Sequence, residues 1–133
     1  MITRRMKTFI HLTNAGAAAS INREGLTCHL DEHVGAKEMK VGHIVNFVTP
    51  DKVGKLLHYF TLMGLCDEEP VVIVFKEDPS KVRKLHHSSF SFVWFISEHN
   101  IPREQIQTII PISDYLDGKF GNGYFLDEEV RRE

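Results

Sequence analysis

The first 25 residues contain the pattern that most constrains the fold of this chain. Residues 8–12 are rich in strand-forming side chains, and Asn14, which follows them, is a typical helix N-cap. The alanine-rich residues 15–23 favour a helix, and Gly25 is placed to end that helix in a left-handed conformation. The pattern therefore predicts a strand that turns sharply into a short helix.

The rest of the chain predicts further strands, most of them late, and helices that come early. Residues 26–40 are polar and mixed, and we expect an irregular loop there. The other elements follow from apolar periodicity and from proline and glycine positions: strands at 43–48, 71–75, 89–96 and 106–112, a helix from 50 to 64, and a helical turn over 79–85. Helices early and strands late predict an α+β fold rather than a doubly wound sheet.

Length and charge limit the class of protein. A chain of 133 residues predicts a single domain over 1–133, with the glycine-containing residues 113–133 as a surface tail. The net charge of −2 excludes a global positive field that would hold nucleic acid non-specifically. The two cysteines do not make a disulfide framework, and no apolar run is long enough for a signal peptide or a membrane span. We therefore expect a cytoplasmic protein without a membrane partner.

His11 and Thr13 are the first candidate site residues. Alternation along a strand places them on the same face, about 6.5–7 Å apart. Both carry hydrogen-bonding groups that can hold a ribose diol or a phosphate near the end of the strand. The alternative is a polar face turned to solvent, or a histidine satisfied by a backbone carbonyl.

Two further positions are candidates because they lie where an element ends. Thr49, before Pro50, begins a predicted helix whose first free N–H groups can meet an anion, although plain capping is the more common role. Lys52 and Tyr59 lie seven residues apart on one face of that helix. Glu98, after the aromatic strand, can stabilise an oxocarbenium-like transition state, or it can be a solvated loop residue.

Histidines suggest two other chemistries. Cys28 and His33 have loosely acceptable spacing for zinc, but no second ligand pair matches them, so we predict no metal site. His11-Leu12-Thr13 and His87-Ser88-Ser89 are two His-x-Thr/Ser elements, which is the arrangement of the 2H phosphoesterases. In that alternative, His11 and His87 act as general acid and base on a phosphodiester.

The order of these segments resembles the ADP-ribosyltransferase superfamily, and in particular the DarT-type DNA ADP-ribosyltransferases. Residues 9–14, the short helix and residues 21–26 resemble the opening of these enzymes. Residues 43–59 are similar to their second strand and following helix, and residues 70–74 and 102–112 to later strands. The resemblance implies an α+β fold with short helices and a split, mixed or antiparallel sheet.

The resemblance also implies a substrate and a reaction. NAD would be cleaved at the bond to nicotinamide, and ADP-ribose would pass to an acceptor, which in this family is a nucleic-acid base. His11 would contact the adenosine-side ribose. The residues that would contact NAD on either side of that bond are His11, Thr13, Asn22, Phe47, Thr49 and Tyr59.

Two departures from the family pattern concern catalysis. The family has an arginine just after its proline, where this chain has Asp51 and Lys52. Its catalytic glutamate falls near Trp94, and the nearest acid here is Glu98. Lys52 and Glu98 are therefore the candidate catalytic residues. The alternative is a catalytically inactive member of the same fold that binds a nucleotide, a nucleic acid or a protein partner.

Overall fold

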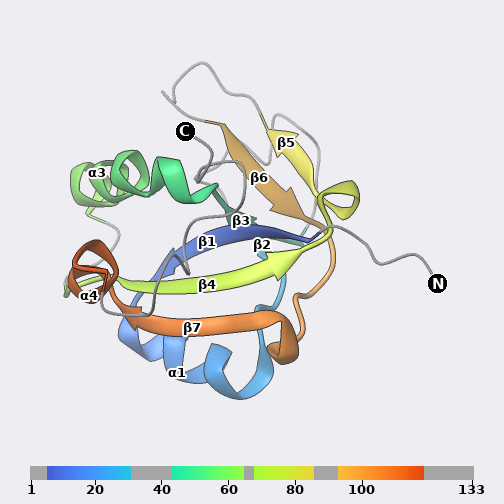
Figure 1. Ribbon diagram of the computed structural model, residues 1–133, viewed down its shortest axis with the longest axis horizontal. Helices are drawn as coiled ribbons and strands as arrows, with labels where there is room; N and C mark the ends of the chain where they lie inside the picture. The colour runs from blue at the N-terminus through green and yellow to red at the C-terminus, as the bar shows by residue number, and fades with distance from the viewer. Residues whose placement is uncertain (1–5, 31–42, 65–67, 86–92, 119–133) are drawn as a thin grey trace.

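The computed structural model describes residues 6–30, 43–64, 68–85 and 93–118 (Figure 1). Within these residues the chain forms two antiparallel sheets with short helices around them. The predicted α+β class, with short helices and a split sheet, is confirmed. The relation to ADP-ribosyltransferases stays a prediction.

The first sheet has the strand order β1-β4-β7. It consists of β1 (Lys7–Thr13), β4 (Val71–Glu77) and β7 (Ile106–Pro111). The middle strand is β4, and four of its first five residues are fully buried, as the continuous apolar run at 71–75 predicted. The register of its pairing with β7 shifts by one residue between Val74 and Phe75, as at a β-bulge.

The second sheet has the order β2-β3-β6-β5. Its strands are β2 (His29–Leu30), β3 (His43–Phe47), β6 (Trp94–Ser97) and β5 (Arg83–Leu85). One backbone pair joins the two sheets: Ile10 and Val48 exchange N–H···O bonds of 2.8 and 2.9 Å. The end of β3 therefore lies directly against the middle of β1.

The helices connect these strands. They are α1 (Ala15–Glu24), η1 (Pro50–Lys52), α3 (Val53–Met63), η2 (Pro79–Lys81), η3 (Arg103–Gln105) and α4 (Ile112–Leu116). Asn14 caps α1 as predicted, since its side-chain oxygen accepts from the Ala17 N–H at 2.8 Å. Gly64 ends α3 with φ +61°.

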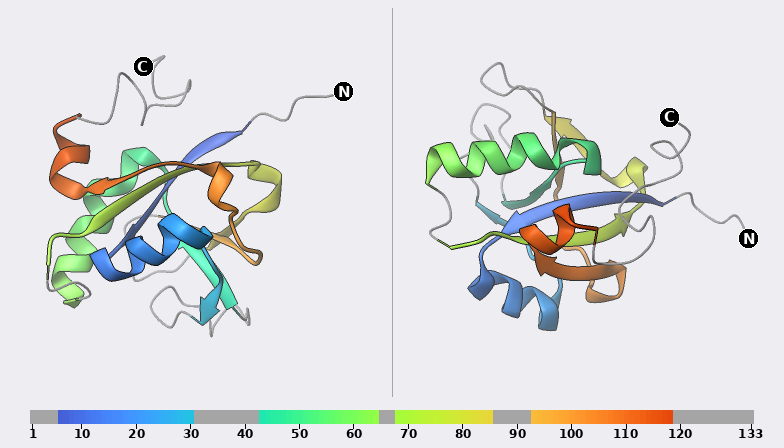
Figure 2. Two further views of the ribbon diagram at one scale, coloured as in Figure 1. Left: turned by 90° about the horizontal axis from the view of Figure 1, so that it is seen from below. Right: turned by 60° about the vertical axis from the view of Figure 1, so that its left-hand side comes forward.

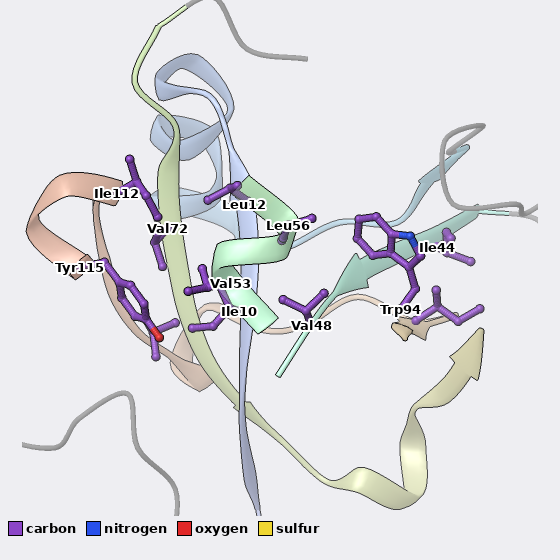
Figure 3. Close-up of a cluster of buried hydrophobic side chains, with 12 residues drawn as sticks. Ile10, Leu12, Ile44, Val48, Val53, Leu56, Val72, Trp94, Ile112 and Tyr115 are labelled. Atoms are coloured by element: carbon purple, nitrogen blue, oxygen red, sulfur yellow. The ribbon is translucent and has the colours of Figure 1, made fainter. Parts of the chain in front are cut away.

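Two hydrophobic clusters fill the space on the two faces of the first sheet. Ile10 and Leu12 point into the cluster under α3, together with Trp94 and Tyr115 (Figure 3). Phe9, which alternates with them on β1, belongs to the second cluster beside α1. The two helices accordingly lie on opposite sides of the sheet (Figure 2). Each side chain of β1 is therefore assigned to one face by strand alternation.

The structure corrects several predicted boundaries. Residues 26–30 are not an irregular loop: Leu26 is 2% exposed and exchanges backbone bonds with Ile101, and β2 follows. Residues 83–85 form a strand rather than a helical turn, because they pair with β6. Gly25 has a positive φ of +84°, but its ψ of −174° lies outside the left-handed helical region.

The sequence prediction also placed the start of the surface tail too early, at residue 113. Residues 112–116 form α4, and Tyr115 is only 4% exposed because its ring packs in the cluster under α3. The rest of that tail, and the predicted strand residues 89–92, lie outside the described residues.

Candidate functional site

A pocket of about 270 Å³ opens beside β1 and α1. Strand β1 contributes His11 and Thr13, and the inner face of α1 and the segment after it contribute most of the rest. The lining residues are His11, Thr13, Ala17, Ser20, Ile21, Gly25, Leu26, Thr27 and Val45. The prediction that His11 and Thr13 share one face is confirmed, since both side chains reach the same pocket.

The backbone of β3 orients the ring of His11. Its Nδ1 lies 2.7 Å from the backbone oxygen of Asn46, and the residue is 8% exposed. A carbonyl oxygen can only accept, so Nδ1 carries the proton that it donates. In the neutral ring, Nε2 is then the acceptor. The alternative prediction, a histidine satisfied by a backbone carbonyl, is therefore correct for Nδ1.

Close backbone packing supports the wall of the pocket that Gly25 and Leu26 form. A Cβ on Gly25 would fall against the carbonyl oxygen of Ile101 and 2.8 Å from the backbone nitrogen of Arg103. The next residue, Leu26, exchanges bonds of 2.9 and 2.8 Å with Ile101. This wall therefore requires glycine at position 25, both for the space and for the positive φ.

Asn22, a predicted NAD contact, does not line the pocket. Its backbone oxygen accepts from Arg103 Nε at 2.8 Å, and its side-chain oxygen accepts from Arg103 Nη2 at 3.1 Å. The third nitrogen of the same guanidinium donates to the backbone oxygen of Ile106 at 3.2 Å. Asn22 therefore fastens the end of α1 to η3.

Phe47, another predicted NAD contact, lies in the core. It is fully buried, and its ring packs edge-on to Phe9 at 4.9 Å and to Phe75 at 5.1 Å between centroids. It lies parallel to Phe95 at 6.4 Å. The ring cannot stack on a ligand without repacking this cluster.

Two predicted NAD contacts, Tyr59 and Thr49, and the candidate catalytic residue Lys52 lie apart from the pocket. Tyr59 packs edge-on to Trp94 at 6.0 Å in the cluster under α3, on the other face of the first sheet from the pocket. Thr49 precedes η1 and makes no capping bond through its side chain, and Lys52 pairs with Asp51 at 3.5 Å. None of these residues lines the pocket. The structure does not bring them together with His11.

Glu98 is paired outside the pocket. Its carboxylate lies 3.0 Å from Arg83 Nη1, and both side chains are about half exposed. Burial, and after it the charge of Glu98, raises the pKa of the Cys28 thiol. Glu98 does not line the pocket itself, and the structure does not place it beside His11.

The remaining predictions concern metals, membranes and His87. Within the described ranges, no three His, Cys, Asp or Glu side chains are placed to hold a metal ion. In the same residues no helix combines the length and the apolar character needed to cross a membrane. His87, which the 2H phosphoesterase alternative needs, lies outside the described residues.

Sequence reasoning missed one wall of the pocket and one buried acid. Ser20 and Thr27 carry hydroxyls at the pocket; the helical spacing of Ala17, Ser20 and Ile21 on one face of α1 was an available signal. Glu77 is 3% exposed, and its carboxylate accepts from the Asp78 N–H at 2.7 Å and lies 3.2 Å from His99 Nε2. Strand alternation in β4 does not indicate the partner of this buried acid, because His99 reaches it from the bend that follows β6.

Comparisons with known proteins do not identify a family for this chain. The chain matches no protein-family model, no curated protein and no solved structure.

Proposed function

We propose that this chain binds a nucleotide of the NAD or ADP-ribose type through the pocket beside β1 and α1, and that it does so as a binding protein. The observation that carries the proposal is the orientation of His11 by Asn46 in a pocket shared with Thr13. The His11 imidazole and the Thr13 hydroxyl, which can both donate and accept, are hydrogen-bonding groups of the kind that match the hydroxyls of a ribose.

The apolar part of the pocket suits the base of the nucleotide. Ile21, Leu26 and Val45 are each at most 8% exposed and line the same space. Ligand sites of this type combine apolar walls with a few polar groups that fix orientation. The resemblance to ADP-ribosyltransferases, with His11 on the adenosine-side ribose, supports the same placement.

Transfer of ADP-ribose to a nucleic-acid base has less support than binding. An oxocarbenium-like transition state needs a carboxylate close to the reacting sugar, and no acid is among the described residues that line the pocket. The two candidate catalytic residues, Lys52 and Glu98, are ion-paired with Asp51 and Arg83 instead. We expect this binding to take place in the cytoplasm, on the sequence argument from the cysteines.

Thermal unfolding with and without ligand tests the proposal. NAD or ADP-ribose at a hundred times its Kd should add about 2.7 kcal/mol to the free energy of unfolding. Replacing Thr13 by valine keeps the shape of the side chain and removes its hydroxyl, so the ligand-induced shift should shrink. The matched control is Thr61→Val on α3, whose hydroxyl donates to Leu57 outside the pocket.

Two outcomes would contradict the proposal. If neither NAD nor ADP-ribose shifts the unfolding temperature at millimolar concentration, the pocket does not bind this class of ligand. If purified protein releases nicotinamide from NAD and this release is lost in His11→Ala, the chain is a transferase or a hydrolase rather than a binding protein.

A further inference from the structure

The described residues that line the pocket are uncharged, apart from the ring of His11. Four of its side chains can form hydrogen bonds: His11, Thr13, Ser20 and Thr27. The other lining residues are aliphatic or glycine, and no lysine or arginine is among the described residues that line the pocket. Sites that bind phosphate normally offer arginine, lysine or a row of backbone N–H groups.

Glu24 does not line the pocket, but its carboxylate is hydrogen-bonded to a residue that does, and we call this position the rim. Ser20, on the last turns of α1, donates its hydroxyl to Glu24 Oε2 at 2.9 Å. The acid is therefore one hydrogen bond away from a residue that lines the pocket. A phosphate placed beside Ser20 would meet this negative charge and would be repelled by it.

The Ala17 N–H in the first turn of α1 is not available to a phosphate. This N–H, at a residue that lines the pocket, is already bonded to the Asn14 side chain. The pocket extends to Ile21 and Gly25 at the C-terminal end of the helix, where the helix dipole disfavours an anion. Arg103 binds that same turn, but its nitrogens donate to Asn22 and to a backbone oxygen outside the pocket lining.

The volume of the pocket also suits a nucleoside without its phosphates. Its volume of about 270 Å³ lies just below the range of about 300–1,000 Å³ for sites that enclose drug-sized ligands. A sugar with its base is of that size, whereas a complete dinucleotide extends well beyond it.

From these observations we infer that the pocket recognises the uncharged nucleoside part of its ligand and that phosphates add nothing to the affinity. The inference rests on the proposed nucleotide binding and narrows it. The ligand class is then a ribonucleoside, or a nucleotide whose phosphates lie in solvent outside the rim at Glu24. A phosphate held by a charged hydrogen bond would instead improve the affinity by about tenfold or more.

A ligand series tests this inference on the full chain. The Kd values of adenosine, AMP and ADP-ribose are measured by calorimetry at low and at high salt. We expect that ADP-ribose binds no tighter than adenosine, within about threefold. Raising sodium chloride from about 50 mM to about 500 mM should leave the Kd of adenosine unchanged, because no charge on the ligand is screened.

A variant that removes the negative charge of Glu24 gives a second test, in which binding should become tighter. Glu24→Gln keeps an acceptor for the Ser20 hydroxyl and removes the negative charge. The variant should bind ADP-ribose about two- to fivefold more tightly at low salt and leave adenosine unchanged. The matched control is Asp51→Asn, which removes one exposed negative charge on η1, outside the residues that line the pocket.

The outcomes separate this inference from the proposed function. If ADP-ribose binds at least tenfold tighter than adenosine, and salt weakens it, the inference is wrong and nucleotide binding stands. If Glu24→Gln and Asp51→Asn change the ADP-ribose affinity equally, the inference is also wrong, since the effect is then not local to the rim. If no member of the series binds, both the inference and the proposed function fail.

Discussion

His11 Nδ1 lies 2.7 Å from the backbone oxygen of Asn46, and this bond ties β1 to β3 one residue along from the Ile10–Val48 bridge. Under the proposed function, this one side chain contributes both to stability and to ligand binding. The carbonyl of Asn46 gains a donor inside the protein, and the imidazole gains a defined orientation toward the pocket. The next prediction follows from this double role.

His11→Ala should lower both stability and affinity. The change leaves the buried oxygen of Asn46 without its ring donor, which costs about 1–3 kcal/mol in the free energy of unfolding. Urea titration measures this cost, and calorimetry measures the loss of nucleoside binding. Unchanged stability would show that water replaces the imidazole at no cost.

Gly25→Ala should destabilise the protein, because the new Cβ meets the backbone at Ile101 and Arg103 and because φ is +84°. We expect a loss of about 1–3 kcal/mol from strain at this position. Gly54→Ala on α3 is the matched control: nothing lies within 4 Å of its Cβ, so it should stabilise the helix by about 0.5–1 kcal/mol. Thermal unfolding of both variants gives the comparison, and effects of the same sign would contradict it.

Arg103→Lys should loosen the end of α1. A lysine keeps the charge but cannot donate at the same time to both oxygens of Asn22 and to the backbone oxygen of Ile106. Amide hydrogen exchange in residues 20–26 should accelerate, and the affinity for adenosine should fall as the pocket wall loosens. Arg83→Lys is the control, because its exposed pair with Glu98 is worth at most about 1 kcal/mol. Equal exchange in the two variants would argue against the role of Arg103.

Tyr115 should make the protein less stable at alkaline pH. Burial raises the pKa of its phenol well above the usual value of about 10. The unfolded chain therefore releases this proton first, and the stability that is fully present below pH 10 is lost progressively as the pH rises. Urea titrations between pH 8 and pH 11 should show a decline that is smaller in Tyr115→Phe. A decline of the same size in both proteins would exclude Tyr115 as its source.

The elements near the start of the chain were predictable because their determinants are local. The cap at Asn14 acts three residues along the chain, and strand alternation alone places His11 and Thr13 on one face. The buried central strand followed from its own apolar run at 71–75. In each case the residues that determine the structure lie within the element or next to it.

The site depended on contacts that no local pattern contains. Leu26 pairs with Ile101, 75 positions later, and Glu98 pairs with Arg83 rather than facing His11. Tyr59 has the helical spacing expected for it, but its helix packs on the opposite face of the sheet from the pocket. These pairings join distant parts of the chain, so the spacing within one segment cannot predict them.

The sequence alone determined the α+β class, the strand and capped helix at the start, and the shared face of His11 and Thr13. Only the tertiary structure decided that α1 and the segment 25–27 form a pocket with that face, and that Lys52, Tyr59 and Glu98 lie outside the pocket. The physical reason is that periodicity and capping act over a few residues. Sheet pairing and core packing decide which distant segments meet.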